Sequence, residues 1–185
     1  MFSTSAQIIS INVKTICTVT AGMWQRVQNA SQPYGLGLEE KLLPQYFKDL
    51  GYSTHIVGKW HLGFFQEAYT PLRRGFDTYF GHWNSKADYY NHTHLSIEKI
   101  PGTSEYYMGY DLHEGLNVSE SRAAMIYEMD VSIGHMVQAL KDKNMLENSI
   151  IVFMSDNGGA AAGLPHTFGN NWPFKGGKVM GASLW

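Results

Sequence analysis

Two segments of the chain carry apolar residues at helical spacing, and each is followed by a short apolar run. Between Glu39 and Leu50 the apolar positions recur every three or four residues, which predicts an amphipathic helix. Pro44 is compatible only with the first turn of that helix, and Gly51 is a natural stop. Over residues 121–141 methionine and aliphatic residues form one apolar face, which predicts a second helix.

The runs that follow these helices predict strands. "YSTHIV" is expected to form a strand that ends at Val57, and "SIIVFM" a buried strand of a parallel sheet. Residues 1–30 show weak alternation, and residues 64–118 have no sustained period, so loops and short elements are expected there. This order of elements predicts an α/β fold. The two strands should be parallel, with their carboxyl ends at one edge of the sheet.

Composition excludes several classes of protein. The 185 residues suit one domain, and a net charge of −2 gives no basic surface for nucleic acid. No apolar run is long enough for a membrane span. Cys17 is the only cysteine, so an internal disulfide and a thiolate metal cluster are excluded. The start of the chain is not a clear signal peptide, yet Asn-x-Ser/Thr sequons at Asn29, Asn91 and Asn117 favour the secretory pathway.

Lys59 and His61 follow the first predicted strand and are candidates for anion binding. In an extended backbone, side chains two residues apart point the same way, so both could reach one ligand. An ammonium and an imidazole suit an anion with several oxygens, such as sulfate, phosphate or a carboxylate. A surface lysine beside a histidine packed on an aromatic ring is the alternative, and the residues alone leave it open.

The second predicted strand is followed by Asp156 and Asn157, in "SDNGG". Their oxygens are ligands for a hard cation such as Ca²⁺ or Mg²⁺, but Ca²⁺ takes about six to eight oxygens. Taken alone, these residues are explained better by a tight turn, because Asp, Asn and Gly are turn residues. Lys178, in "FKGGKVMG", is a further possible anion donor, although a single lysine is usually solvated.

Taken in order, four stretches resemble the sulfatase family. They are "LLPQYFKDLGYSTHIVGKWHLG", "RRGFDTYFG", "SIIVFMSDNGG" and "NNWPFKGGK", and the likeness is strongest to the arylsulfatase B-like branch, the N-acetylgalactosamine-4-sulfatases. The resemblance spans residues 21–118 and 121–185, with residues 1–20 divergent. It implies that residues 1–185 form part of an alkaline-phosphatase/sulfatase-like N-terminal catalytic domain, a mostly parallel sheet flanked by helices.

The resemblance also implies roles for individual residues. Lys59 and His61 match the family's Gly-Lys-Trp-His motif, in which the lysine holds the sulfate and the histidine contacts the hydrated formylglycine and the sulfate oxygens. Asp156 and Asn157 match a pair that binds Ca²⁺, and Lys178 matches a lysine that contacts the sulfate near the leaving oxygen. The implied ligand is a sulfated glycan of glycosaminoglycan type or a small aryl sulfate. The implied location is lysosomal or secreted.

Important parts of the family pattern are missing. The formylglycine precursor is a cysteine in Cys-x-Pro-Ser-Arg, whereas Cys17 stands in "CTVTA". The early Asp-Asp pair that completes the Ca²⁺ site has no counterpart. Between about residues 118 and 121 a segment with a core strand and another active-site histidine is missing, and the family continues beyond Trp185. The Ca²⁺ site is therefore expected to be incomplete.

We expect a sulfuric ester hydrolase domain, truncated at both ends and shortened internally, that is inactive as it stands. One alternative is a non-catalytic binder of sulfated glycans that uses Lys59, His61 and the aromatic segment 64–118. Another is a phosphatase or phosphodiesterase of the same superfamily. That reaction needs a serine or threonine nucleophile and several Asp and His ligands for two metals. The sequence shows no such set, and it leaves the oligomeric state open.

Overall fold

The computed structural model of the protein describes residues 7–11, 30, 32–85, 87–88, 91–118 and 125–154. In these residues the strands and helices are β1 (Gln7–Ile11), α2 (Leu43–Asp49), β2 (Ser53–Lys59), β3 (Thr78–His82), β4 (Thr93–Lys99), β5 (Tyr106–Tyr110), β6 (Leu112–Glu114), β7 (Asn117–Val118), α3 (Met125–Asp142) and β8 (Ser149–Phe153). Short 3-10 helices form at Glu67–Tyr69, Pro71–Arg74 and Leu146–Asn148.

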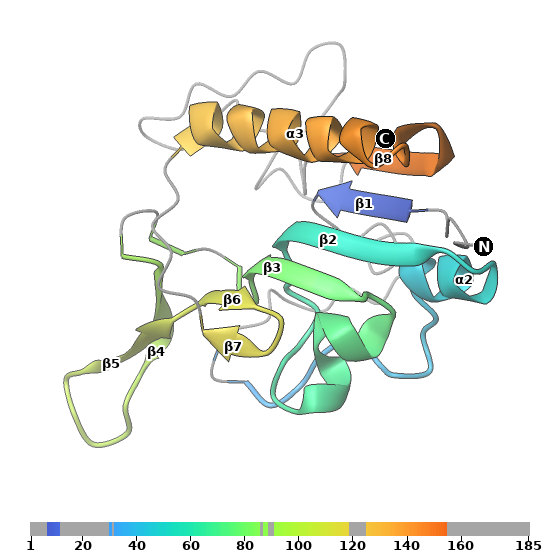
Figure 1. The fold of residues 1–185 in the computed structure, drawn as a ribbon. Helices are drawn as coiled ribbons and strands as arrows, with labels where there is room; N and C mark the ends of the chain where they lie inside the picture. The colour runs from blue at the N-terminus through green and yellow to red at the C-terminus, as the bar shows by residue number, and fades with distance from the viewer. Residues whose placement is uncertain are drawn as a thin grey trace, which may run out of the picture.

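A six-stranded sheet in the order β7-β6-β3-β2-β1-β8 is the centre of the fold (Figure 1). β1 pairs in parallel with both β2 and β8, and β2 pairs in parallel with β3. Val57, Ile11 and Phe153 are in register across β2, β1 and β8. The prediction that the two strands are parallel, with their carboxyl ends at one edge, is therefore confirmed, as is the α/β class. β6 and β7 are antiparallel additions to the far side of β3.

α2 begins later than the sequence pattern predicts. The helix covers Leu43–Asp49 rather than residues 39–50, because Pro44 has no backbone N–H to donate and must lie in the first turn. Gln45 Oε1 accepts a hydrogen bond from the backbone N–H of Leu42 (2.7 Å) and so caps the start. Gly51 ends the helix as predicted, with a φ of 82°.

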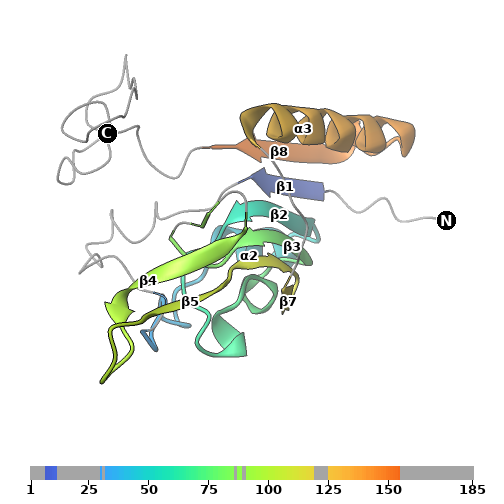
Figure 2. The ribbon, with the colours of Figure 1, turned by 90° about the vertical axis from the view of Figure 1, so that its left-hand side faces the viewer.

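Residues 64–118 form short strands between loops. They contain β3, β6 and β7 of the main sheet, and β4 and β5, which form a separate two-stranded hairpin. Figure 1 shows this hairpin projecting beyond β6, and Figure 2 shows its two strands side by side. Pairing with neighbouring strands stabilises these strands, and such pairing does not require a regular spacing of apolar residues along the sequence. The loops and short elements expected in this segment are therefore present, and the sequence did not show that three of the short strands join the main sheet.

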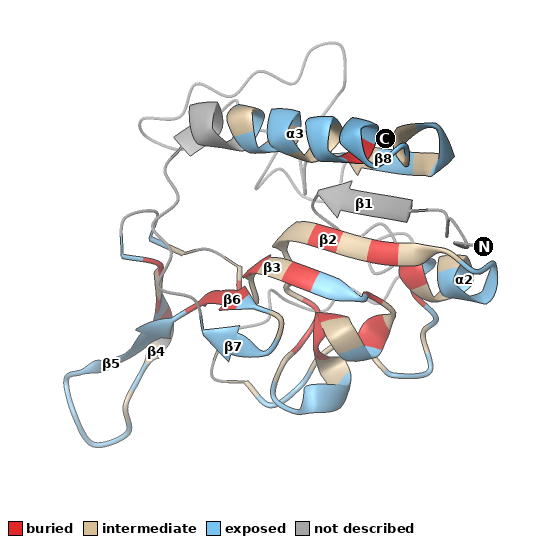
Figure 3. Cartoon of the chain, viewed as in Figure 1, coloured by how far each residue is buried: buried red, intermediate tan, exposed pale blue. Residues whose placement is uncertain are grey.

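The prediction of a buried β8 was wrong. β8 lies at the edge of the sheet as far as the described residues extend, and Ile150, Ile151 and Phe153 are 41%, 38% and 62% exposed. In Figure 3, burial concentrates in β2, β3, β6 and the segments beside them, not in β8. A continuous apolar run identifies a strand, but the burial of its side chains depends on what packs on the two faces of the sheet.

The core lies at the β2–β3 side of the sheet. Trp60 is 0% exposed and packs in one cluster with Leu42, Ile56, Leu62, Phe76 and Tyr79. Its indole Nε1 donates to the carbonyls of Gly63 (2.9 Å) and Tyr69 (3.0 Å). A Cβ on Gly81 would lie 1.7 Å from the carbonyl oxygen of Gly58, so only glycine permits this approach of β2 to β3. Among the described helices, none is long and apolar enough to cross a membrane.

Candidate oxyanion site

Lys59 is the last residue of β2, at the carboxyl edge of the sheet. The strand runs two residues beyond the predicted end at Val57, because the pairing of β2 with β3 continues through Gly58–Gly81 to Lys59–His82. Residues in register on neighbouring strands point to the same face of a sheet. The Lys59 and His82 side chains therefore lie on one face, side by side.

His61 is presented by a different backbone from the one predicted. β2 ends at Lys59, and His61 has a φ of 53°, so the chain is not extended between them. Its position is fixed instead by its backbone N–H, which donates to the carbonyl of Trp83 (2.9 Å). Just before it, the N–H of Trp60 donates to the carbonyl of His82 (2.8 Å). The fully buried Trp60 anchors the segment between the two cationic residues.

Sequence reasoning missed two histidines: His82, which is in register with Lys59, and His92, whose ring faces that of His82. The ring centroids of His82 and His92 are 6.5 Å apart, with an interplanar angle of 25°. His92 is 5% exposed, and its backbone is held by hydrogen bonds with Asp88 (2.9 Å) and Asp111 (2.8 Å). The sequence signal was the histidine-rich "GHW" and "NHTH", within a segment interpreted as loops.

Asp111, the residue between β5 and β6, joins this histidine group to the end of β3. Its carboxylate is 1% exposed and accepts hydrogen bonds from the backbone N–H (3.0 Å) and Nδ2 (2.7 Å) of Asn84. Its carbonyl contacts Nδ1 of His113 at 2.8 Å, and the His113 ring stacks on Trp83 with centroids 3.7 Å apart. The carboxylate oxygens are therefore engaged by Asn84 rather than by the histidines.

Burial governs the protonation of these groups. It lowers the pKa of His82, the neighbouring His92 lowers that pKa further, and a hydrogen bond to the Asp111 carbonyl acts in the opposite sense. Lys59 and His113 contribute smaller lowering effects on the same pKa. Burial raises the pKa of the Asp111 carboxyl to about 6, against the hydrogen bonds from Asn84. Lys59 thus lies beside the His82 imidazole, whose protonation is disfavoured.

The other predicted site residues cannot be compared in the same way. Asp156, Asn157, Lys178 and Cys17 lie outside the described residues. The described part of β8 ends at the same edge as β2, with β1 between them. No group of three or more His, Cys, Asp or Glu side chains that could hold a metal ion occurs in the described part of the chain. The assignments of Asp156, Asn157 and Lys178 stay predictions.

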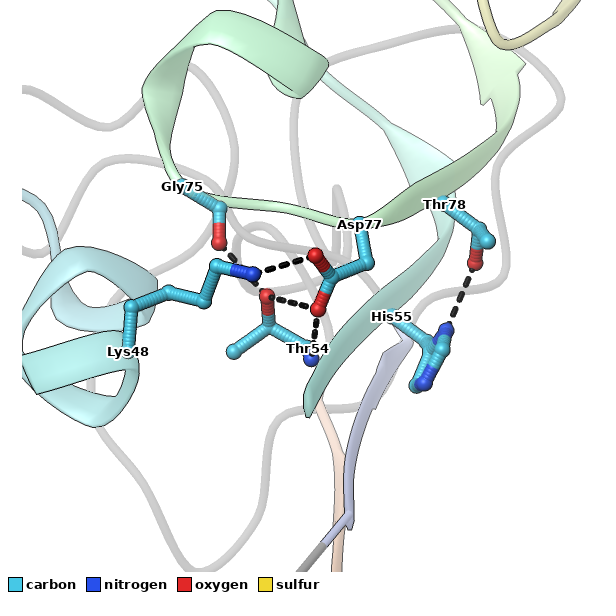
Figure 4. A network of polar contacts seen from close by, with 6 residues as sticks. All are labelled: Lys48, Thr54, His55, Gly75, Asp77 and Thr78. Atoms are coloured by element: carbon cyan, nitrogen blue, oxygen red, sulfur yellow. Dashed lines mark hydrogen bonds and ion pairs between the residues drawn. The ribbon is translucent and has the colours of Figure 1, made fainter. Parts of the chain in front are cut away.

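The amino ends of β2 and β3 carry a different polar network (Figure 4). Asp77 accepts hydrogen bonds from the backbone N–H (2.9 Å) and hydroxyl (3.5 Å) of Thr54, and it forms an ion pair with Lys48. The Thr54 hydroxyl also donates to the Gly75 carbonyl (2.5 Å). At this end the Asp77 carboxylate balances the charge of Lys48. At the other end the Asp111 carboxylate accepts hydrogen bonds from Asn84.

Comparison with known proteins agrees with this arrangement. The family model described as Sulfatase matches residues 17–111 and 90–182. The chain belongs to the sulfatase family. The mixed sheet with Lys59 at its carboxyl edge is thus the sheet of a sulfatase.

Named relatives cover most of this sulfatase chain. Arylsulfatase J of Mus musculus is 31% identical over 86% of the chain and 35% of its own length. N-acetylgalactosamine-6-sulfatase of Homo sapiens is 28% identical over 78% of the chain and 37% of its own length. The chain thus spans little more than a third of these relatives. The specific likeness to arylsulfatase B stays a prediction.

A solved structure has the same fold as this sulfatase chain. The crystal structure of Ps i-CgsB in complex with k-i-k-neocarrahexaose superposes with a TM-score of 0.59 at 20% identity. The match covers 80% of this chain and 46% of that one. The alkaline-phosphatase/sulfatase-like class predicted from the sequence is therefore confirmed.

Proposed function

We propose that this chain is the sulfate-binding part of a sulfuric ester hydrolase for sulfate esters of glycosaminoglycan type, and that it does not hydrolyse them as it stands. The observation that carries the proposal is the position of Lys59 at the carboxyl edge of β2, in register with His82. In open α/β sheets, ligands bind outside the carboxyl ends of the strands.

The chemistry of the edge suits a sulfate ester. The Lys59 ammonium offers a compact charge with three N–H donors, and an imidazole offers a directional donor. Sulfate oxygens accept such bonds, and charge-assisted hydrogen bonds are the stronger kind. The fixed backbone of residues 59–61, held by Trp60, keeps these donors in place before a ligand arrives.

Hydrolysis needs more than a site that binds the sulfate. It requires a nucleophile, a counter-charge for the sulfate and an acid for the leaving alcohol. The surroundings of Cys17, "CTVTA", lack the proline and arginine of the formylglycine motif. We therefore expect binding without turnover.

A Ca²⁺ ion is implied by the family, with Asp156 and Asn157 as its ligands here. The described residues supply no further group of ligands, so they do not by themselves fit a Ca²⁺ ion, and no step of the proposed binding uses one. Two side chains fall short of the about six to eight oxygens that Ca²⁺ takes. Binding of Ca²⁺ to this chain is expected to be weak.

The β4–β5 hairpin supports a glycan rather than a small aryl sulfate as the ligand. Its outer face carries Leu95, Met108 and Tyr110, which are 53%, 69% and 60% exposed, and Leu95 pairs with Met108. The root of the hairpin is joined to the end of β3 through Asp111 and Asn84. Tyrosine rings offer flat, amphipathic surfaces on which the C–H face of a sugar can pack. A glycan at Lys59 could extend onto this face.

The location proposed for the protein is lysosomal or secreted. Asn91 and Asn117, each the first residue of a sequon, are both exposed. Exposure is what attachment of a glycan to these residues requires.

Turnover is tested with nitrocatechol sulfate and the full chain. We expect no release of nitrocatechol. Formylglycine at Cys17 in a mass spectrum, together with turnover that Cys17→Ala abolishes, would contradict the proposed lack of hydrolysis.

The glycan preference is tested by calorimetry with a chondroitin sulfate hexasaccharide and with inorganic sulfate. Tyr110→Ala is expected to weaken hexasaccharide binding several-fold and to leave sulfate binding unchanged. Tyr46→Ala is the matched control, because Tyr46 is 53% exposed on α2 and contacts a lysine, Lys41, at 4.4 Å. Equal affinities for both ligands, or equal effects of both variants, would exclude the hairpin as a glycan surface.

A further inference from the structure

Three buried side-chain nitrogens at the carboxyl edge have no hydrogen-bond partner among the described residues: His82 Nδ1, Trp83 Nε1 and His92 Nε2. Leaving such a group unsatisfied is unfavourable, and buried polar groups in folded proteins are nearly always paired with protein, water or an ion. The indole nitrogen can only donate. Both nitrogens of an imidazole donate once the ring is protonated, so a ligand that accepts hydrogen bonds would satisfy His82 Nδ1 and His92 Nε2 in that state.

His82 Nδ1 belongs to the face of the sheet that carries Lys59, and the His92 ring faces the His82 ring, whereas the Trp83 side chain packs against the core cluster. Lys59 and His82 are in register on β2 and β3, and the His82 ring stacks toward His92. Trp83 follows His82, and its carbonyl holds the backbone N–H of His61 (2.9 Å). The backbone thus links the unsatisfied nitrogens to both residues of the proposed sulfate site.

The charges around His82 favour an anion as the ligand. Lys59 approaches the His82 ring from β2, His113 from β6 and His92 from the segment before β4, while Asp111 presents its backbone carbonyl. The Asp111 carboxylate accepts hydrogen bonds from Asn84, and the charged group that acts on its pKa is His94. Positively charged or donor groups thus outnumber available acceptors around His82 within the described residues.

We propose that His82 and His92 form a second layer of the oxyanion site behind Lys59 and His61, and that binding of a sulfate group there is coupled to protonation of His82. The inference rests on the proposed function, since it takes the sulfate to be held at Lys59. The proton comes from solvent and adds to the neutral ring, which gains a second N–H. No bond of the sulfate breaks.

The direction of the coupling follows from electrostatics. Without an anion, burial and the neighbouring His92 hold the pKa of His82 below its ordinary value of 6.5. A sulfate beside the ring offsets the repulsion from Lys59 and accepts the new N–H, so it raises that pKa. By reciprocity, protonation of His82 strengthens sulfate binding by the same factor. A shift of one unit in this pKa corresponds to about a tenfold change in sulfate affinity.

The experiment measures protons taken up per sulfate bound. Inorganic sulfate is titrated into the full chain by calorimetry between pH 5.5 and 7.5, in two buffers of different ionisation enthalpy. Uptake of a fraction of a proton is expected, with tighter binding at the lower pH. His82→Gln should remove most of that uptake, and His92→Gln should weaken binding and reduce the uptake.

His55→Gln is the matched control. His55 lies on β2 like Lys59 but toward the amino end, and burial also lowers its pKa. Its replacement should leave proton uptake unchanged. His61→Gln separates the two layers, because uptake that disappears in this variant and persists in His82→Gln would assign the proton to His61 and overturn the inference.

The outcomes separate this inference from the proposed function. Sulfate binding without proton uptake, or uptake that His82→Gln leaves intact, overturns the second layer and leaves the sulfate site standing. No sulfate binding at all overturns both. If His82→Gln fails to fold, the His82 ring is titrated by NMR in the unaltered protein. A pKa that rises with sulfate supports the inference, and an unchanged pKa contradicts it.

Discussion

The two ends of the β2–β3 pair have opposite polar character. At the amino end, Asp77 balances Lys48 and accepts the backbone N–H of Thr54, so charge and hydrogen bonds are matched (Figure 4). At the carboxyl end, Lys59 lies beside His82, and buried nitrogens of His82 and His92 lack partners in the described part of the chain. A closed network stabilises the strands, whereas a surplus of donors leaves capacity for a ligand. The amino ends of these two strands thus contribute to stability, and their carboxyl ends are available for binding a ligand.

The largest expected effect is on stability, at the amino end. Asp77→Ala leaves the backbone N–H of Thr54, a residue that is 0% exposed, without its carboxylate partner. We expect a loss of roughly 1–3 kcal/mol in the free energy of unfolding. Urea denaturation measures it. Glu67→Ala, which removes the exposed pair with Arg73, should cost less than about 1 kcal/mol.

Sulfate binding should survive Asp77→Ala under conditions where the variant is folded. A sulfate affinity that falls together with stability would mean that the two ends do not act separately.

Acid should act through His82 and through Asp77 in different pH ranges. The pKa of His82 is lowered by burial, so the unfolded chain binds more protons, and stability falls as the pH drops below about 6.5. For Asp77, burial alone would raise the pKa, but the bonds from Lys48 and Thr54 outweigh it, so the pKa lies below its ordinary value. That contribution is present above about pH 4 and is lost as the pH falls further.

Asp111 acts in the opposite sense, because burial raises its pKa to about 6 and its stabilising contribution is lost as the pH rises toward that value. The pH profiles of unfolding for His82→Gln and Asp77→Asn should therefore each differ from the unaltered profile in one range only. His82→Gln should flatten the decline just below pH 6.5. Identical profiles for the two variants would contradict the assignment of separate pH ranges.

The smallest effect on stability is expected at the exposed contact between Thr78 and His55. Thr78→Val removes the contact between the Thr78 hydroxyl and Nδ1 of His55 (2.8 Å), which is exposed. The free energy of unfolding should fall by at most about 1 kcal/mol, since water can replace the hydroxyl. A loss as large as that of Asp77→Ala would mean that the network depends on His55.

The sequence predicted the part of this arrangement that local patterns determine. Gly51 and Pro44 set the limits of α2, and helices before β2 and β8 predicted parallel strands with a shared edge. Lys59 and His61 were identified from their spacing, although the predicted reason, an extended backbone, does not hold at His61. The spacing instead reflects Trp60, whose burial requires its neighbours to face elsewhere.

What the sequence could not predict depends on contacts between distant segments. The β2–β3 register places His82 beside Lys59, and backbone hydrogen bonds with Asp88 and Asp111 hold His92. Their segment has no period, so it gave no sign of strands. The exposure of β8 was missed for the same reason, since an apolar run does not reveal what packs on the faces of its strand.

The most direct test compares the lysines at the two ends. Inorganic sulfate is titrated by calorimetry into the unaltered chain, Lys59→Met and Lys48→Met, with folding of each checked by circular dichroism. We predict saturable binding that Lys59→Met weakens at least about tenfold, since it removes a charge-assisted contact, and that Lys48→Met leaves unchanged. Equal affinities in Lys59→Met and the unaltered chain, or a loss in Lys48→Met alone, would contradict an oxyanion site at the carboxyl edge.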